Sequence, residues 1–224
     1  MNSAPELGLV TSNSYPSGTG SYSYDGEFNV VVENLAYIKE VAIFAELGPT
    51  WKAVDAEYRQ GLPGNRELWV APASNGEGQF VVRYSVNGAT YWDNNAGNNY
   101  KFPQAFDDFL ALTGRNYRVI MANAGLSGGT MKVVIGVHNL AYLKTVGVVY
   151  STDNWQTVHT AYATYARTMS SGLEIWNADA NVGSASEVIL AVFYRVSGNE
   201  YWDNNFTRNY KVTPTKPQKW AEAP

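Results

Sequence analysis

Two short stretches of this sequence place a pair of aromatic residues directly before a run of amides. Tyr91 and Trp92 are followed by Asp93-Asn94-Asn95, and the same order recurs from Tyr201 to Asn205. An amide side chain offers two hydrogen-bond donors and an acceptor, and a flat indole covers apolar ring faces. These groups together suit a neutral, hydroxyl-rich ligand with apolar ring faces, and a sugar is such a ligand.

The position of these rings on strands predicts which of them are displayed. Neighbouring side chains on a strand point to opposite faces, so a sandwich core takes either Tyr91 or Trp92, and we expect the other ring on the surface. Asparagine-rich turns are also stable turns in their own right, because asparagine tolerates the left-handed backbone conformation. Trp51 and Trp155 lie in turn-rich stretches, so we expect them on the surface. Trp69 and Trp176 lie within apolar runs, so we expect them in the core.

Composition excludes several classes of partner. The 224 residues carry a net charge of −4, with 14% aromatic and 16% charged residues and no cysteine. Nucleic-acid binding needs clustered Lys and Arg to neutralise phosphates, and the chain has no basic run. No apolar stretch approaches the ~18 residues of a membrane span. We therefore expect neither a nucleic-acid nor a membrane partner, and no thiol chemistry.

The residues that could catalyse a reaction or hold a metal are too few. Glycoside hydrolysis needs two carboxyl groups close together, and each repeated motif supplies one, Asp93 or Asp203. One carboxylate is also a poor cage for calcium. Residues 125–129 fit a hydrolase nucleophile elbow, but a strand is expected after them where that motif needs a helix. His138 and His159 lack ligand spacing. No catalytic residue, metal or cofactor is expected.

The chain repeats itself. Asn34–Val41 recurs as Asn139–Val146, and Tyr84–Phe102 recurs as Tyr194–Val212. In each copy, apolar residues alternate at a period of two, as at residues 28–32, which predicts half-buried strands. Turn residues separate these strands every 8–12 residues or so, and this spacing is typical of a β-sandwich.

The repeat also predicts how the chain divides. We expect a first module over residues 1–104, a joint over 105–116, a second module over 117–213 and a tail or linker over 214–224. Within the joint, residues 106–112 have the pattern of a short helix.

The repeated strings resemble those of a known family. The pattern N-L-A-Y-x-K followed by a loop Trp and then Y-W-D-N-N-x-x-x-N-Y resembles the family 21 carbohydrate-binding modules, over roughly residues 15–102 and 117–212. Members include starch-binding domains of fungal glucoamylases and glycogen-targeting regions of protein phosphatase 1 regulatory subunits. The resemblance implies an all-β chain of two immunoglobulin-like β-sandwich domains in tandem, which binds α-1,4-glucan and catalyses nothing.

The resemblance also implies which residues bind. A main site would use the loop Trp, the aromatic before D-N-N and the asparagine loop, with the motif carboxylate and a matching Lys beside them. In the first copy these residues are Trp51, Trp92, Asp93, Asn94, Asn95, Asn99 and Lys39. In the second they are Trp155, Trp202, Asp203, Asn204, Asn205, Asn209 and Lys144. A second patch would pair Tyr37 with Tyr58 and Tyr142 with Tyr162.

The sequence departs from the family pattern at several positions. Gly48-Pro49-Thr50 replaces the Asp-Asn pair before the first loop Trp, and Val81 and Ala191 stand where a family aromatic would be. These departures bear most on the second patch.

Two roles are compatible with such a chain. One is a secreted, monomeric module that brings an attached amylolytic enzyme to α-glucan polysaccharide. The alternative is a cytoplasmic, glycogen-associated scaffold that recruits a phosphatase. The resemblance implies that a scaffold carries an Arg-Val-x-Phe docking motif outside the module, and the nearest strings, 118–121 and 195–198, lack the Phe.

Overall fold

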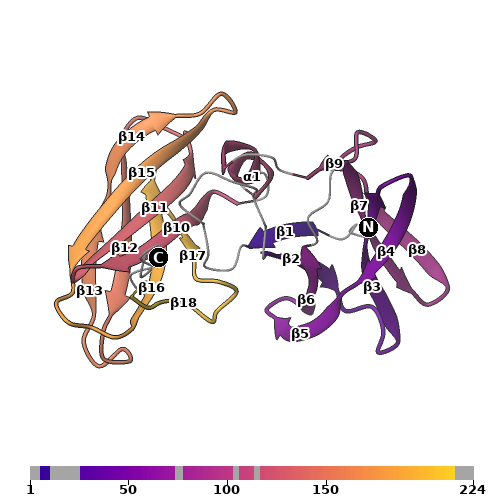
Figure 1. Ribbon diagram of the computed structural model, residues 1–224, viewed down its shortest axis with the longest axis horizontal. Helices are drawn as coiled ribbons and strands as arrows, with labels where there is room; N and C mark the ends of the chain where they lie inside the picture. Colours follow the sequence, from indigo (N-terminus) through magenta and orange to yellow (C-terminus); the bar gives the residue numbers. More distant parts are fainter. Residues whose placement is uncertain (1–5, 11–25, 74–77, 103–105, 114–116, 215–224) are drawn as a thin grey trace, which may run out of the picture. The chain divides into compact units, whose positions relative to one another are not determined.

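The chain forms two compact units, residues 1–116 and 117–224, and each is described by itself (Figure 1). The computed structural model describes residues 6–10, 26–73, 78–102, 106–113 and 117–214. Most of the expected tail, residues 215–224, therefore lies outside the described residues, as do residues 105 and 114–116 of the expected joint.

The described residues of the first unit form nine strands and one short helix. They are β1 (Glu6–Val10), β2 (Gly26–Glu33), β3 (Lys39–Leu47), β4 (Thr50–Asp55), β5 (Glu57–Leu62), β6 (Arg66–Ala73), β7 (Gln79–Val86), β8 (Ala89–Asp93), β9 (Tyr100–Lys101) and α1 (Phe106–Thr113). The helix expected at 106–112 is thus confirmed as α1.

The second unit consists of nine strands in its described residues. They are β10 (Val119–Ser127), β11 (Thr130–His138), β12 (Lys144–Ser151), β13 (His159–Tyr162), β14 (Thr164–Thr168), β15 (Leu173–Asn181), β16 (Val188–Val196), β17 (Asn199–Asp203) and β18 (Tyr210–Val212).

Each unit is a sandwich of two antiparallel sheets, and the strand order is the same in both. The first unit has a four-stranded sheet, β1-β2-β6-β5, and a five-stranded sheet, β4-β3-β7-β8 with β9 beside β7. The second unit repeats these orders as β10-β11-β15-β14 and β13-β12-β16-β17 with β18 beside β16. The expected all-β fold is therefore confirmed.

The hairpins of the five-stranded sheets are closed by two-residue turns. Asn87 and Gly88 connect β7 to β8 with φ of 53° and 74°, and Ser197 and Gly198 connect β16 to β17 with φ of 50° and 77°. Positive φ at both positions is the type I′ turn, whose twist matches that of paired strands. This tight turn fixes the register that decides which aromatic of each hairpin faces out.

Aromatic and aliphatic side chains fill the space between the sheets. In the first unit, Phe28 of β2 packs against Phe80 of β7 and Phe102, with ring centroids 4.9 and 5.9 Å away. In the second unit, Ile135 and Leu190 are fully buried. Packing of rings from facing sheets is what the period-two alternation at residues 28–32 predicts for one face.

The expectation of half-buried strands is wrong for two strands. In β2, Asn29 and Val31 are buried together with Phe28, Val30 and Val32. The other strand is β16. Its inward residues are buried as predicted, but Ala191 and Phe193, which alternate with them, are buried too. The reason is tertiary, since side chains from the neighbouring strands cover the outer face of β16.

Candidate functional site

The strand register of the β7–β8 hairpin separates the two neighbouring aromatics as expected. Tyr91 pairs with the core residue Tyr84, and the two ring centroids are 6.0 Å apart. Trp92 pairs with Arg83 on the opposite face and is 45% exposed. In the second unit, Trp202 occupies the same position on β17 and has the same exposed fraction. The predicted display of these two tryptophans is confirmed.

Three aromatic rings form a cluster on the outer face of the first unit's five-stranded sheet. The ring of Phe44 stacks on Trp51 with centroids 5.7 Å apart, and it is T-shaped to Trp92 with centroids 5.9 Å apart. Trp51 is displayed at 38% exposure, as predicted. Sequence reasoning missed Phe44, although its place in the alternation of β3 puts it on the outer face with these tryptophans.

The second unit places different residues around its exposed Trp202. The ring of Phe193 lies 5.6 Å from Trp202 and 6.3 Å from Tyr162. Tyr162, which was expected to belong to the second patch, thus shares a face with a main-site residue. Its ring and that of Trp202 both pack on Phe193, a residue that the sequence analysis did not single out.

The expected equivalence of Tyr58 and Tyr162 is wrong. Tyr58 pairs with Trp69 across β5 and β6, and the residue that pairs with Trp176 in the same way is Tyr165. Each tyrosine meets its tryptophan edge-on, at 5.9 and 5.8 Å. The error arises because the loop before β13 differs in length between the units, which shifts the alignment by a few residues.

The expected second patch stays a proposal, and its two pairs of rings do not touch in the described structure. Tyr37 and Tyr142 lie in the loops before β3 and β12 and are 98% and 94% exposed. The ring contacts of the described residues join neither Tyr37 to Tyr58 nor Tyr142 to Tyr162.

The two tryptophans expected in the core lie at its margin. Trp69 and Trp176 are half-buried. Each indole N–H donates to a carboxylate, at 3.0 Å for Trp69 to Glu67 and 3.1 Å for Trp176 to Glu174. A buried indole N–H needs an acceptor, and the carboxylate at the sheet margin supplies it.

Trp155 belongs to a loop built by hydrogen bonds from its own residues. The Ser151 hydroxyl accepts from the Trp155 amide at 2.9 Å, and Asp153 accepts from the amide and hydroxyl of Thr157 at 2.9 and 2.7 Å. These donors, led by the Thr157 amide, lower the pKa of Asp153 to about 2. Trp155 has a left-handed backbone, with φ of 67°, and is half-buried, where display was expected. Such strain persists only where the surrounding structure imposes it.

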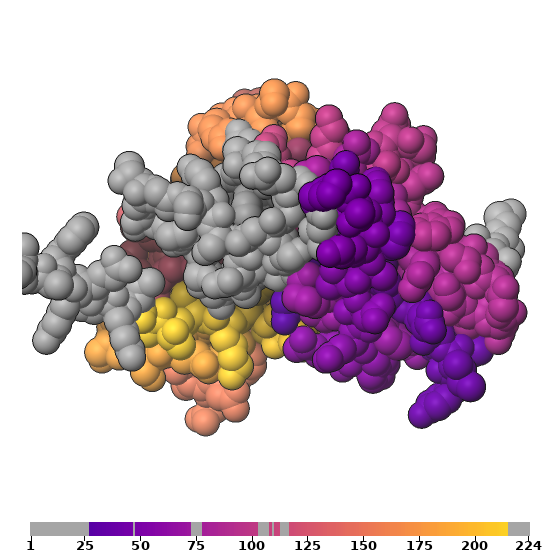
Figure 2. Space-filling model, turned by 45° about the vertical axis from the view of Figure 1, so that its right-hand side comes forward, coloured from indigo at the N-terminus to yellow at the C-terminus, as the bar shows by residue number. Residues whose placement is uncertain are grey.

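The asparagine loops use many of their amides to hold their own shape. The Asn95 side chain donates to the Asn99 carbonyl at 2.8 Å, and Asn205 does the same to Asn209 at 3.0 Å. Asn94 accepts from the amide of Gly97. Asn204 accepts in the same way from Thr207, and Asn99 donates to Gln79. These loops are therefore preorganised, and Figure 2 shows the yellow end of the second unit, which contains one of them, at the surface.

The motif carboxylates lie under these loops and bond to tyrosines. The Tyr100 hydroxyl lies 2.7 Å from both oxygens of Asp93, and Tyr210 lies 2.8 and 2.9 Å from those of Asp203. Asp203 also accepts from the Met121 amide at 2.7 Å. Burial raises the pKa of Asp203 in spite of these donors. Both residues are half-buried and hydrogen-bonded within the protein, and their expected place in the site stays a proposal.

The two lysines expected to donate to a ligand are buried. Lys39 bonds Glu67 at 2.8 Å and Lys144 bonds Glu174 at 2.8 Å, and the lysine side chains are only 2% and 3% exposed. Each ammonium also donates to the Asn of the N-L-A-Y-x-K string, Asn34 in the first unit and Asn139 in the second. The prediction that these lysines contact a ligand is wrong. The sequence pattern identifies the lysine, but it does not show that a glutamate from the facing sheet pairs with it.

The described residues contain neither a metal-binding arrangement nor a membrane-spanning helix. No group of three or more His, Asp or Glu side chains in the described ranges is placed to hold a metal ion. Within the same ranges, no helix has the length and apolar character needed to cross a bilayer.

The comparisons with known proteins identify relatives for about half of the chain. The model of a family described as carbohydrate/starch-binding module (family 21) matches residues 114–213. Glucoamylase 1 of Rhizopus oryzae is 37% identical over 107 residues, which are 42% of this chain and 18% of that protein. Protein phosphatase 1 regulatory subunit 3C of Bos taurus is 25% identical over 121 residues, which are 50% of this chain and 37% of the relative. The chain thus spans less than two fifths of the length of either relative.

Several solved structures are similar to part of the chain. The starch-binding domain of Rhizopus oryzae glucoamylase, solved in complex with β-cyclodextrin and maltoheptaose, is 29% identical. The match covers 50% of this chain and 98% of that domain, with a TM-score of 0.39.

Proposed function

Because residues 114–213 belong to the family 21 carbohydrate/starch-binding modules, we propose that this chain binds α-1,4-glucans such as starch, glycogen and malto-oligosaccharides without cleaving them. The observation that carries the proposal is the display of Trp92 and Trp202 on the outer faces of the two five-stranded sheets, beside preorganised asparagine loops. An exposed indole shelters the C–H face of a glucose ring from water, while amides bond its hydroxyl groups.

We propose that the first unit is a second such module. The support is the repeated Y-W-D-N-N motif, the identical strand order and the same internal bonds of the asparagine loops. The main site of the first unit then comprises Trp51, Phe44, Trp92 and the loop residues Asn94, Asn95 and Asn99. In the second unit it comprises Trp155, Trp202 and the loop residues Asn204, Asn205 and Asn209.

Two weak sites on one polymer bind more tightly than either alone, since the second contact forms at a high effective concentration. This reasoning supports a role as a monomeric targeting module, which holds an attached amylolytic enzyme on extracellular polysaccharide. The match to glucoamylase 1 favours this role.

A scaffold that brings an enzyme to cytoplasmic glycogen is the second candidate. The similarity to a protein phosphatase 1 regulatory subunit favours it. The string Arg118-Val119-Ile120-Met121 is unsuited to docking a phosphatase because its last three residues belong to strand β10. A scaffold role would therefore require a docking segment elsewhere in the parent protein.

Gel electrophoresis through soluble starch or glycogen tests the proposed binding. We expect the chain to be retarded, and the combined replacement of Trp51, Trp92, Trp155 and Trp202 by Ala to abolish retardation with little change in thermal unfolding. Lys132→Ala, which removes an exposed side chain on β11 of the four-stranded sheet, is the control and should migrate like the wild type. Unaltered migration of the wild-type chain in the glucan gel would contradict the proposal.

A further inference from the structure

In the second unit, one row of residues crosses four strands of the five-stranded sheet. Tyr162 of β13 pairs with Gly147 of β12, Gly147 pairs with Phe193 of β16, and Phe193 pairs with Trp202 of β17. Directly paired residues of antiparallel strands share a face, so the row runs across the outer face of the sheet.

Gly147 makes room for the ring in the middle of this row. A Cβ atom at this position would lie 2.6 Å from Cζ of Phe193 and 2.8 Å from the Ala161 carbonyl oxygen. The Phe193 ring therefore lies across the neighbouring strand and is fully buried. Above it, Tyr162 is 65% exposed and Trp202 is 45% exposed. Phe193 thus joins two displayed rings into one aromatic surface.

A hydrogen bond at the edge of the indole ring fixes the orientation of Trp202. Its indole N–H donates to Glu200 at 2.6 Å, and the other carboxylate oxygen of Glu200 accepts from Arg195 at 2.7 Å. The Arg195 guanidinium carbon in turn lies 4.6 Å from the centre of the Phe193 ring, a cation–π contact. Because its N–H is already bonded, Trp202 is left to bind through its ring face.

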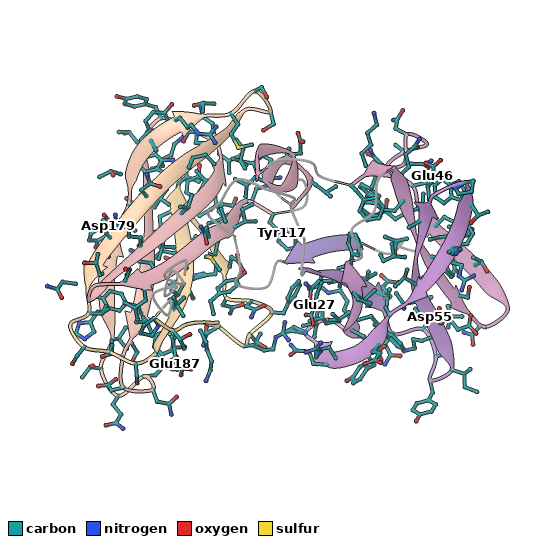
Figure 3. All side chains as sticks on the ribbon, in the orientation of Figure 1. Glu27, Glu46, Asp55, Tyr117, Asp179 and Glu187 are labelled. Atoms are coloured by element: carbon teal, nitrogen blue, oxygen red, sulfur yellow. The ribbon has the colours of Figure 1, made fainter. Side chains whose placement is uncertain are left out.

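The same row of the first unit has different chemistry. Asp55, which is labelled in Figure 3, pairs with Ala42, and Ala42 pairs with Arg83, which in turn pairs with Trp92. Arg83 there makes an ion pair with Glu40 at 3.7 Å. The first unit's aromatic partner for Trp92 is instead Phe44, which lies on the next row of the sheet.

We infer that Tyr162 and Trp202 bind a single linear α-glucan segment together, as one extended site that crosses the sheet of the second unit. Phe193 is the positioning residue of this site, because the rings of Tyr162 and Trp202 both pack on it. Gly147 leaves the space that the Phe193 ring occupies. The inference rests on the proposed glucan binding and deepens it, because the extended site selects segments long enough to cover both rings. The first unit, with Asp55 and Arg83 in this row, has no counterpart of it.

The test uses the full chain with Trp51→Ala and Trp92→Ala, which silences the three-ring cluster of the first unit. Titration calorimetry with maltoheptaose and with maltose measures stoichiometry and affinity. We expect one maltoheptaose per chain, and Tyr162→Ala and Trp202→Ala should each weaken its binding on the order of tenfold. Tyr162→Ala should affect maltose less, since a short ligand covers only one ring. Lys132→Ala, on β11 of the four-stranded sheet, is the control and should leave both affinities unchanged.

A swap of residues between the units tests the positioning role. The pair Gly147→Ala and Phe193→Arg installs the first unit's residues and should cause the same loss as Tyr162→Ala, with folding checked by thermal unfolding. If that variant does not fold, Phe193→Leu keeps an apolar side chain at this position but removes the ring that contacts Tyr162 and Trp202, and it should cause the same loss.

Three results would overturn the inference while the wild-type chain still binds glucan. The first is two maltoheptaose molecules in the silenced background, with each substitution removing one and leaving the affinity of the other unchanged. The second is an unchanged affinity in Tyr162→Ala, and the third is a background variant that binds nothing. Absence of binding by the wild-type chain would instead overturn the proposed function.

Discussion

The ammonium group of Lys144 lies 2.8 Å from a carboxylate oxygen of Glu174, and the two side chains are only 3% and 9% exposed. Glu174 belongs to the four-stranded sheet and Lys144 to the five-stranded one, so this ion pair joins the two layers of the second unit. The first unit repeats it with Lys39 and Glu67, also at 2.8 Å. Because the same ion pair occurs at the same place in both units, we infer that the lysine of the N-L-A-Y-x-K string stabilises the packing of the two sheets.

Replacing Lys144 by Met should destabilise the second unit by about 3–5 kcal/mol, because Glu174 is left buried without its cation. Urea denaturation measures this loss. Lys211→Met is the control: its pair with Glu187 is exposed, so its loss should cost under about 1 kcal/mol. Weaker glucan retardation by Lys144→Met with unchanged stability would show that the lysine contacts ligand instead.

Phe44→Val should weaken glucan binding by the first unit, since Val149 stands at the equivalent position of the second unit and supports no such cluster. Loss of the ring between Trp51 and Trp92 removes about 0.5–1.5 kcal/mol of aromatic packing, which corresponds to roughly two- to tenfold in affinity. Calorimetry in a chain with Trp155→Ala, Tyr162→Ala and Trp202→Ala isolates the first unit. Equal affinities with Phe and Val at position 44 would contradict a role for this ring.

Gly147→Ala should destabilise the second unit by about 1–3 kcal/mol, because the new methyl group meets both the Phe193 ring and the backbone oxygen of Ala161. Thermal unfolding measures the shift. Gly125→Ala on β10 provides the matched control, since a Cβ there has no neighbour within 4 Å. Equal stability of the two variants would mean that the Phe193 ring moves aside freely.

The Asp153 loop should loosen only in strong acid. The pKa of Asp153 is lowered to about 2 in the folded protein from 3.8, so the ionised form stabilises the loop. This contribution is fully present above about pH 4 and is lost as pH falls through about 2. The amide proton shift of Thr157, followed by NMR, should titrate with a midpoint near 2, and Asp153→Asn should abolish the titration. A midpoint near 3.8, the ordinary pKa of an aspartate, would show that the loop does not hydrogen-bond the Asp153 carboxylate.

Much of the fold could be predicted because its signals are local. Alternating apolar residues indicated strands, and the repeated Y-W-D-N-N string marked a hairpin and loop in each unit. The tight turns at Asn87-Gly88 and Ser197-Gly198 fix the register of those hairpins, and register alone decides that Trp92 and Trp202 face outward. Such features depend on residues a few positions apart, so a single sequence contains them.

The parts that failed depend on residues from distant strands. The sequence shows that residue 39 is a lysine but not whether its side chain is solvated or buried. It is buried because Glu67 of the facing sheet pairs with it. Tyr162 and Trp202 are 40 positions apart in the chain, and the Phe193 ring lying across Gly147 joins them into one surface. The sequence by itself therefore determined the repeat, the strands and the aromatic and amide residue types of the candidate site. The tertiary structure decided which rings share a face and which polar groups are already bonded, since those contacts exist only once the sheets have assembled.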